Sequence, residues 1–70
     1  MPVREILEQL VAEMVEKGIR YQDAQREFEK RFISRVVQKS NGNLCRAADT
    51  LGVHRNTLTR KIKELKIRPR

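Results

Sequence analysis

A short polar run near the end of the chain carries the side chains with the richest chemistry. Its donors, acceptors and cations are His54, Arg55, Asn56, Thr57, Thr59, Arg60, Lys61 and Lys63. A guanidinium can bond a guanine edge through two parallel donors, and a carboxamide can do the same to adenine. Hydroxyl and ammonium groups bind phosphate. This combination of side chains is typical of a surface that binds nucleic acid.

The spacing of this run predicts a helix with one apolar and one polar side. With Leu58 at the origin of a helical wheel, Ile62 and Leu65 lie within about 40° of it and would face a core. The residues on the far side, at about 100° to 200°, are Asn56, Thr59, Arg60 and Lys63. Arg55 lies on the shoulder in the first turn. A helix of this width fits the major groove of B-DNA, which is about 12 Å across.

The charge is unevenly distributed along the chain. Sixteen Lys and Arg against nine Asp and Glu give a net charge of +7. Residues 1–32 hold six basic and seven acidic side chains, a net of −1, whereas residues 33–70 hold ten basic and two acidic, a net of +8. We therefore expect one half of the chain to pack and the other half to meet a polyanion.

Apolar residues recur at helical spacing through the first half of the chain. In the first segment they are Val3, Ile6, Leu7, Leu10, Val11, Met14 and Val15, and the pattern predicts a helix. Gly18 supplies the left-handed residue that ends it. A second helix is predicted from about Tyr21 to Ser40, where the turn residues Ser40-Asn41-Gly42 end it.

Two further helices are predicted in the basic half. Asn43 can cap a short third helix that ends at Gly52. A fourth is predicted over residues 54–65, and residues 66–70 are expected to fray.

Small residues mark the junction of these two helices. Ala47 and Ala48 lie on the first of the two, and Gly52 lies in the turn. Helices that cross at a steep angle through a short turn approach closely and need small side chains at the crossing. The segment therefore predicts a helix-turn-helix.

The string GNLCRAADTLGVHRNTLTRKIKEL, residues 42–65, resembles the C-terminal helix-turn-helix of the Fis family. Its second part, RNTLTRKIKEL, is especially similar to the DNA-binding domain of NtrC-type enhancer-binding activators. The resemblance implies an all-α, four-helix protomer that forms a single domain over residues 1–70. Residues of about 2–40 would be dimerisation helices, and about 42–65 the helix-turn-helix, with its last helix in the major groove.

The resemblance also implies roles for individual residues. Arg55 matches the family's base-reading arginine, while His54 stands where Fis has an asparagine and Cys45 where it has a threonine. The positions that match phosphate contacts are Asn43, Thr57, Arg60 and Lys63. Together with side-chain chemistry this gives two predicted sets. The base contacts are His54, Arg55, Asn56 and Thr59, and the phosphate contacts are Asn43, Thr57, Arg60, Lys61 and Lys63.

The first two helices present more apolar surface than a helix-turn-helix can cover. Leaving four or five large side chains in water would forgo roughly 1.5 to 3 kcal/mol each, which is comparable with the stability of a small domain. A second copy around a twofold axis would cover them and set two recognition helices about 34 Å apart. The predicted dimer interface consists of Leu7, Leu10, Val11, Met14, Phe28 and Phe32.

The composition argues against several other classes of protein. Cys45 is the only cysteine, which excludes an intramolecular disulfide and a cysteine-based zinc site, and His54 has no His or Cys partner at helical spacing. With no nucleophile triad and no phosphate-binding glycine loop, we expect no enzyme, no cofactor and no metal. No apolar stretch is long enough for a bilayer, so we expect a cytoplasmic, nucleoid-associated protein.

The sequence therefore predicts a homodimer that binds specific double-stranded DNA and acts in transcription regulation or DNA bending, with the transcription machinery as a further partner. Two alternatives stay open: a module of a larger activator, and a helical dimerisation or adaptor module without DNA specificity. Binding to an anionic membrane is disfavoured because the core already uses the apolar side of the last helix. RNA binding is disfavoured because Tyr21 is the only candidate for an exposed stacking aromatic.

Overall fold

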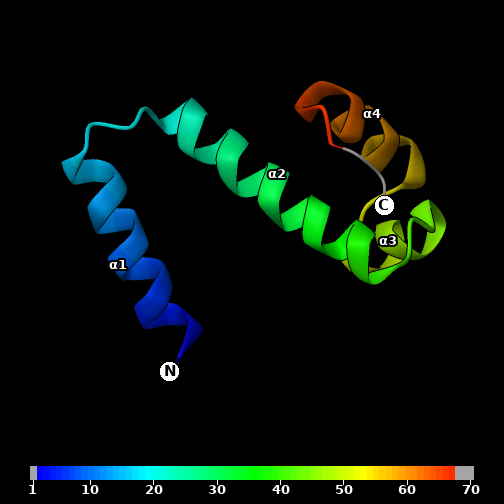
Figure 1. The fold of residues 1–70 in the computed structure, drawn as a ribbon, viewed down its shortest axis with the longest axis horizontal. Coiled ribbons are helices and arrows are strands. Elements are labelled where there is room, and N and C mark those ends of the chain that lie inside the picture. The colour runs from blue at the N-terminus through cyan, green and yellow to red at the C-terminus, as the bar shows by residue number, and fades with distance from the viewer. Residues whose placement is uncertain (1, 68–70) are drawn as a thin grey trace.

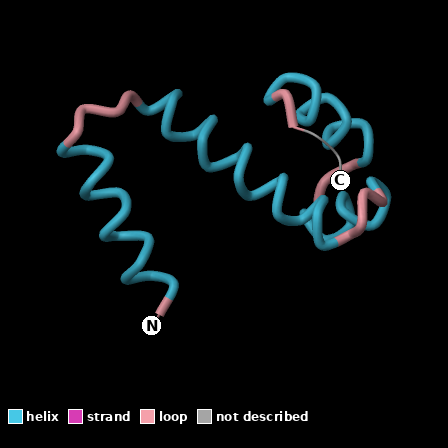
Figure 2. The backbone as a smooth tube through the Cα atoms, viewed as in Figure 1, coloured by secondary structure: helices cyan, strands magenta, loops and turns pink. Residues whose placement is uncertain are grey.

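The computed structural model describes residues 2–67, and over that range the chain is all-α. The helices are α1 (Val3–Glu16), α2 (Tyr21–Lys39), α3 (Leu44–Leu51) and α4 (Arg55–Leu65). Figure 1 shows α3 and α4 gathered at the end of the long α2, whereas α1 diverges from the start of α2. The tube in Figure 2 shows that the helices are joined by short loops. The predicted all-helical class is thus confirmed for the described residues.

The core lies between α2, α3 and α4. Its buried apolar residues are Ile33, Val37, Ala47, Ala48, Leu58, Leu65 and Ile67. Val36, Leu44, Leu51 and Ile62 are half-buried and pack against this cluster. The prediction that Leu58, Ile62 and Leu65 form the inner side of the last helix is therefore confirmed.

The turn between α3 and α4 follows the small residues that predicted it. Ala47 and Ala48 are 0% and 3% exposed, so at these two positions α3 contributes only methyl groups to the core. Gly52 has a φ of +74°, a conformation that costs glycine little and other residues more. The Val53 amide donates to the Ala48 carbonyl (3.1 Å) and the Gly52 amide to the Asp49 carbonyl (3.2 Å). These two bonds close the end of α3 in a Schellman motif.

The helix α1 stands apart from the core. None of its residues is buried, and its large apolar side chains other than the half-buried Met14 are exposed, from 46% at Leu10 to 80% at Val3. Gly18 ends it as predicted, with a φ of +72° and a bond from the Ile19 amide to the Met14 carbonyl (3.0 Å). Within the described residues, the apolar stripe of α1 therefore lacks a covering surface.

Three boundaries differ from the sequence-based expectation. The second helix ends at Lys39, with Ser40 as its cap, and the fourth begins at Arg55, with His54 as its cap. The expectation that residues 66–70 fray is wrong at Ile67. This side chain is only 6% exposed, and its amide donates to the Ile62 carbonyl (3.0 Å). Residues 68–70 lie outside the described residues.

Replacement of the core leucine of α4 tests this packing. Leu58 is 1% exposed, so Leu58→Ala should lower the free energy of unfolding by about 2 to 5 kcal/mol through lost burial and the cavity left behind. Urea denaturation followed by circular dichroism at a fixed protein concentration measures the change.

Val53→Ala is the matched control, because Val53 lies just before α4 and is 40% exposed. We expect it to cost less than about 1 kcal/mol. Equal losses for the two variants would contradict the core described above.

Candidate nucleic-acid interface

The outer side of α4 carries the polar residues predicted to meet DNA. Arg55, Asn56, Thr59, Arg60 and Lys63 are all exposed. They lie opposite the side that contributes Leu58 and Leu65 to the core. Within residues 2–67, Arg55, Arg60 and Lys63 form no ion pair. Three cations on one short helix are therefore available to a polyanion.

Two polar contacts hold α4 against α2. The Lys61 ammonium lies 2.9 Å from a carboxylate oxygen of Glu29, and both side chains are largely shielded from solvent. The Arg26 guanidinium donates to the Glu64 carbonyl (3.3 Å), close to the C-terminal end of α4, where a cation is favourable. Both contacts lie on the α2 side of α4 and add modestly to the burial of Leu58 and Leu65, which keeps the outer side of the helix facing away from α2.

Lys61 departs from the predicted arrangement. It is expected from the sequence to contact phosphate, yet its ammonium is paired with Glu29 on the core-facing shoulder of α4. Thr57 lies on the same shoulder and is half-buried. The wheel position already separates these two residues from Asn56, Thr59, Arg60 and Lys63. We leave Lys61 out of the proposed phosphate contacts because its ammonium is already paired; Thr57 has no such pairing and stays among them.

The first turn of α4 is shaped by side chains that bond to its own backbone. The Asn56 amide donates to His54 Nδ1 (3.0 Å), and this bond satisfies one of the helix's unpaired N-terminal amides. Thr59 Oγ1 donates to the Arg55 carbonyl (3.0 Å). With its proton used in this way, Thr59 presents only oxygen lone pairs and a methyl group to a ligand.

Asn43 stands at the start of the neighbouring helix. Its side-chain oxygen accepts a hydrogen bond from the Arg46 amide (3.1 Å), which confirms the predicted cap of α3. The amide nitrogen of the same side chain remains as a donor. Asn43 is exposed, so this donor is accessible to solvent.

The sequence reasoning missed the capping role of His54. Residues at this position of a helix are most often Ser, Thr, Asn or Asp, and a histidine there gave no signal of a cap. The only available indication was its place directly before the helical run RNTL. The partners of Lys61 and Glu64 were also missed, because they come from a distant part of the chain.

An apolar groove separates α1 from α2. It is an open hollow of about 780 Å³, and its walls include every residue predicted for the dimer interface: Leu7, Leu10, Val11, Met14, Phe28 and Phe32. The rings of Phe28 and Phe32 lie 5.3 Å apart between centroids, and each is about half exposed. The structure thus brings the six residues together on one apolar surface.

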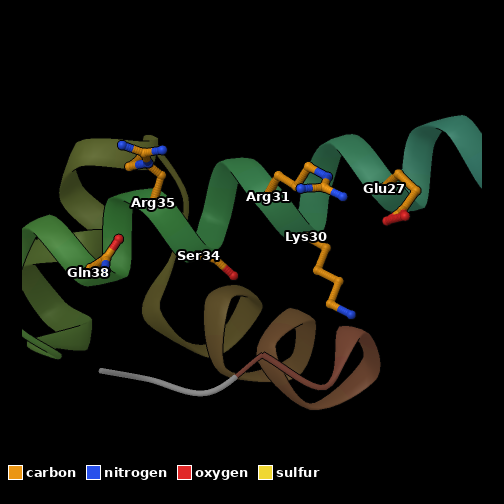
Figure 3. Close-up of a pocket in the computed structure, with 6 residues that line it drawn as sticks. All are labelled: Glu27, Lys30, Arg31, Ser34, Arg35 and Gln38. Carbon is orange, nitrogen blue, oxygen red and sulfur yellow. The ribbon is translucent and has the colours of Figure 1, made fainter.

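A polar hollow runs along another side of α2, lined by Glu27, Lys30, Arg31, Ser34, Arg35 and Gln38. Figure 3 shows that Lys30 and Arg35 point to different sides of the helix. Their charges do not converge on one point, so this hollow lacks the geometry of a single anion site.

The described residues offer little for other chemistry. No group of His, Cys, Asp and Glu among them could hold a metal ion, and Cys45 is exposed and free. None of the helices in residues 2–67 combines the length and the apolar character needed to cross a bilayer.

Comparison with known families agrees with the geometry of the helix-turn-helix. Residues 24–65 match the family model of bacterial regulatory proteins of the Fis family, which covers more than half of the chain. The chain belongs to the Fis family. The matched range takes in most of α2 and all of α3 and α4, and it contains every core residue except Ile67. No curated protein and no solved structure matches the chain. A Fis-family helix-turn-helix is a DNA-binding regulatory module, and α4 is its second helix.

Proposed function

We propose that this protein binds specific double-stranded DNA as a homodimer and regulates transcription or bends DNA. The observation that carries the proposal is the outer side of α4, where Arg55, Arg60 and Lys63 are exposed and form no ion pair among the described residues. Beneath them, Leu58 and Leu65 are buried. The apolar side of the helix therefore holds it to the core, and its cations face outward, where they can bind the phosphates that line a DNA groove.

The residues of α4 and the start of α3 divide into two roles. Arg55 and Asn56 suit base edges, because a guanidinium and a carboxamide each make paired hydrogen bonds to a purine. His54 and Thr59 complete the proposed base-contacting set. Asn43, Thr57, Arg60 and Lys63 are proposed to bind phosphates and fix the register of the helix in the groove.

The apolar groove between α1 and α2 supports the second part of the proposal. Six large apolar side chains line it and are exposed or, at Met14, half-buried. Burying the remaining half of each would contribute on the order of 1 kcal/mol per side chain. A second copy presents the same surface, and a twofold axis lets each copy cover the other. Such a dimer sets two α4 helices to meet half-sites about 34 Å apart.

The finer assignment rests on the sequence of α4. The string RNTLTRKIKEL resembles the DNA-binding domain of NtrC-type activators, so we propose a regulatory role of that type, with the transcription machinery as a further partner. The proposed place of action is the nucleoid in the cytoplasm, where the DNA is.

Single substitutions in α4 separate base contacts from phosphate contacts. Arg55→Ala should weaken binding to the preferred site by about 1 to 3 kcal/mol and relax the preference at one base pair of each half-site. Lys63→Ala should weaken binding to all sequences alike and lower the salt dependence by about one charge per protomer. Fluorescence anisotropy with preferred and scrambled duplexes, over a salt series, measures both effects.

Lys61→Ala is the matched control for Lys63→Ala. It removes the same charge from a position two residues earlier, where the lysine is already paired with Glu29. We expect a smaller effect on DNA affinity than that of Lys63→Ala. If Arg55→Ala lowers every site equally, Arg55 does not read bases; if Lys61→Ala matches Lys63→Ala, the assigned orientation of α4 is wrong.

A charge placed in the apolar groove tests the dimer. Phe32 lines the groove and lies outside the core cluster, so Phe32→Asp should leave the helix-turn-helix folded while shifting the protein from dimer to monomer in sedimentation equilibrium. Burial of an unpaired carboxylate in an apolar interface is the physical reason.

Val3→Asp is the control, because Val3 is on the same apolar stripe but does not line the groove and is 80% exposed. It should leave the dimer in place. A wild-type protein that sediments as a monomer would contradict the proposed dimer without affecting the assignment of α4.

A further inference from the structure

His54 is held in one chemical form by the helix that follows it. Its backbone is extended, with φ −72° and ψ 146°, as expected for the residue that caps a helix. Its ring nitrogen Nδ1 accepts a hydrogen bond from the Asn56 amide at 3.0 Å. A ring nitrogen that accepts carries no proton, and a neutral imidazole has only one N–H. The proton of His54 therefore resides on Nε2.

The position of the ring directs this proton away from the protein. The two nitrogens are separated by one ring carbon and their bonding directions diverge widely, so a ring whose Nδ1 faces the first amides of α4 directs Nε2 away from them. His54 is exposed, and no hydrogen bond from Nε2 is formed within residues 2–67. The result is a single N–H donor at the N-terminal end of the recognition helix, one residue before Arg55.

The four bases differ in what they offer such a donor in the major groove. Guanine presents N7 and O6, which both accept. Adenine combines an accepting N7 with a donating amino group, thymine sets O4 beside a methyl group, and cytosine presents only a donating amino group. A single N–H donor therefore finds an acceptor on every base except cytosine, and the acceptor that the two purines share is N7.

We propose that His54 is a specificity-determining residue that reads the N7 of a purine through Nε2–H and rejects cytosine, because its bond to the Asn56 amide removes Nδ1 as an acceptor toward DNA. The same ring serves both roles: the helix sets the tautomer, and a ring that can only donate has no partner on cytosine. This inference rests on the proposed function, since it names the class of base that the same surface recognises.

The tautomer is measured first, without DNA. Nitrogen-15 NMR of the histidine ring in the free wild-type protein, at a pH where the imidazole is neutral, should show protonated Nε2 and unprotonated Nδ1. The same pattern should persist in the complex with a duplex selected by the wild-type protein. A ring protonated on Nδ1 would overturn the inference.

The base contact is measured with 7-deazaguanine and 7-deazaadenine, which lack the N7 acceptor, placed at each purine of the selected duplex in turn. Wild-type protein should lose affinity roughly three- to ten-fold at one purine of each half-site. H54S keeps a residue that caps helices well but does not reach the base, so it should show no loss at that purine while still losing affinity at any guanine read by Arg55.

The outcomes separate this inference from the proposed function. A wild-type protein that selects no duplex sequence would overturn the proposed function and the inference with it. A wild-type protein that selects a site, but whose profile with the 7-deazapurines equals that of H54S, would overturn only the purine contact of His54. Circular dichroism and urea denaturation of H54S should match those of the wild type, so an unchanged helix accompanies the changed profile.

Discussion

The attachment of α4 to α2 and α3 determines where the charges of this protein go. Leu58 and Leu65 are buried on one side of α4, and the Lys61–Glu29 pair and the Arg26 contact with the Glu64 carbonyl add to this attachment. The helix carries four cations and one acid between Arg55 and Leu65, so a helix free to rotate would present no defined charged surface. Because its leucines hold it in one orientation, α4 presents Arg55, Arg60 and Lys63 on the side that faces away from α2.

The N-terminal half of the molecule has the opposite property: its apolar side chains are exposed. In α1 no residue is buried, although its apolar stripe is continuous, and the groove it forms with α2 is open. A small domain gains too little from its own core to leave such a surface in water at no cost. The proposed twofold dimer would cover this surface and would also set the spacing of two recognition helices. Stability and DNA recognition would then depend on the same interface.

The sequence predicted the features that depend on local chemistry. The ends of α1 and α3 followed from Gly18 and Gly52, and the inner side of α4 followed from the spacing of its leucines, because both signals lie within one or two turns. The role of Lys61 could not be predicted, since Glu29 lies on another helix and only the packed structure brings them together. The burial of Ile67 could not be predicted for the same reason, because it depends on packing against other helices. The bond from Asn56 to His54 is local, but composition does not reveal which ring nitrogen accepts it.

The most direct test is a map of amide chemical shifts in the ¹⁵N-labelled protein as a duplex selected by the protein itself is added. The attachment of α4 described above predicts that the largest changes fall on residues 54–63 and around Asn43, while the amides beside the Glu29–Lys61 contact on α2 change little. Changes confined to α2, with α4 unaffected, would show that the exposed cations of α4 do not form the DNA-binding surface and would contradict the account at its centre.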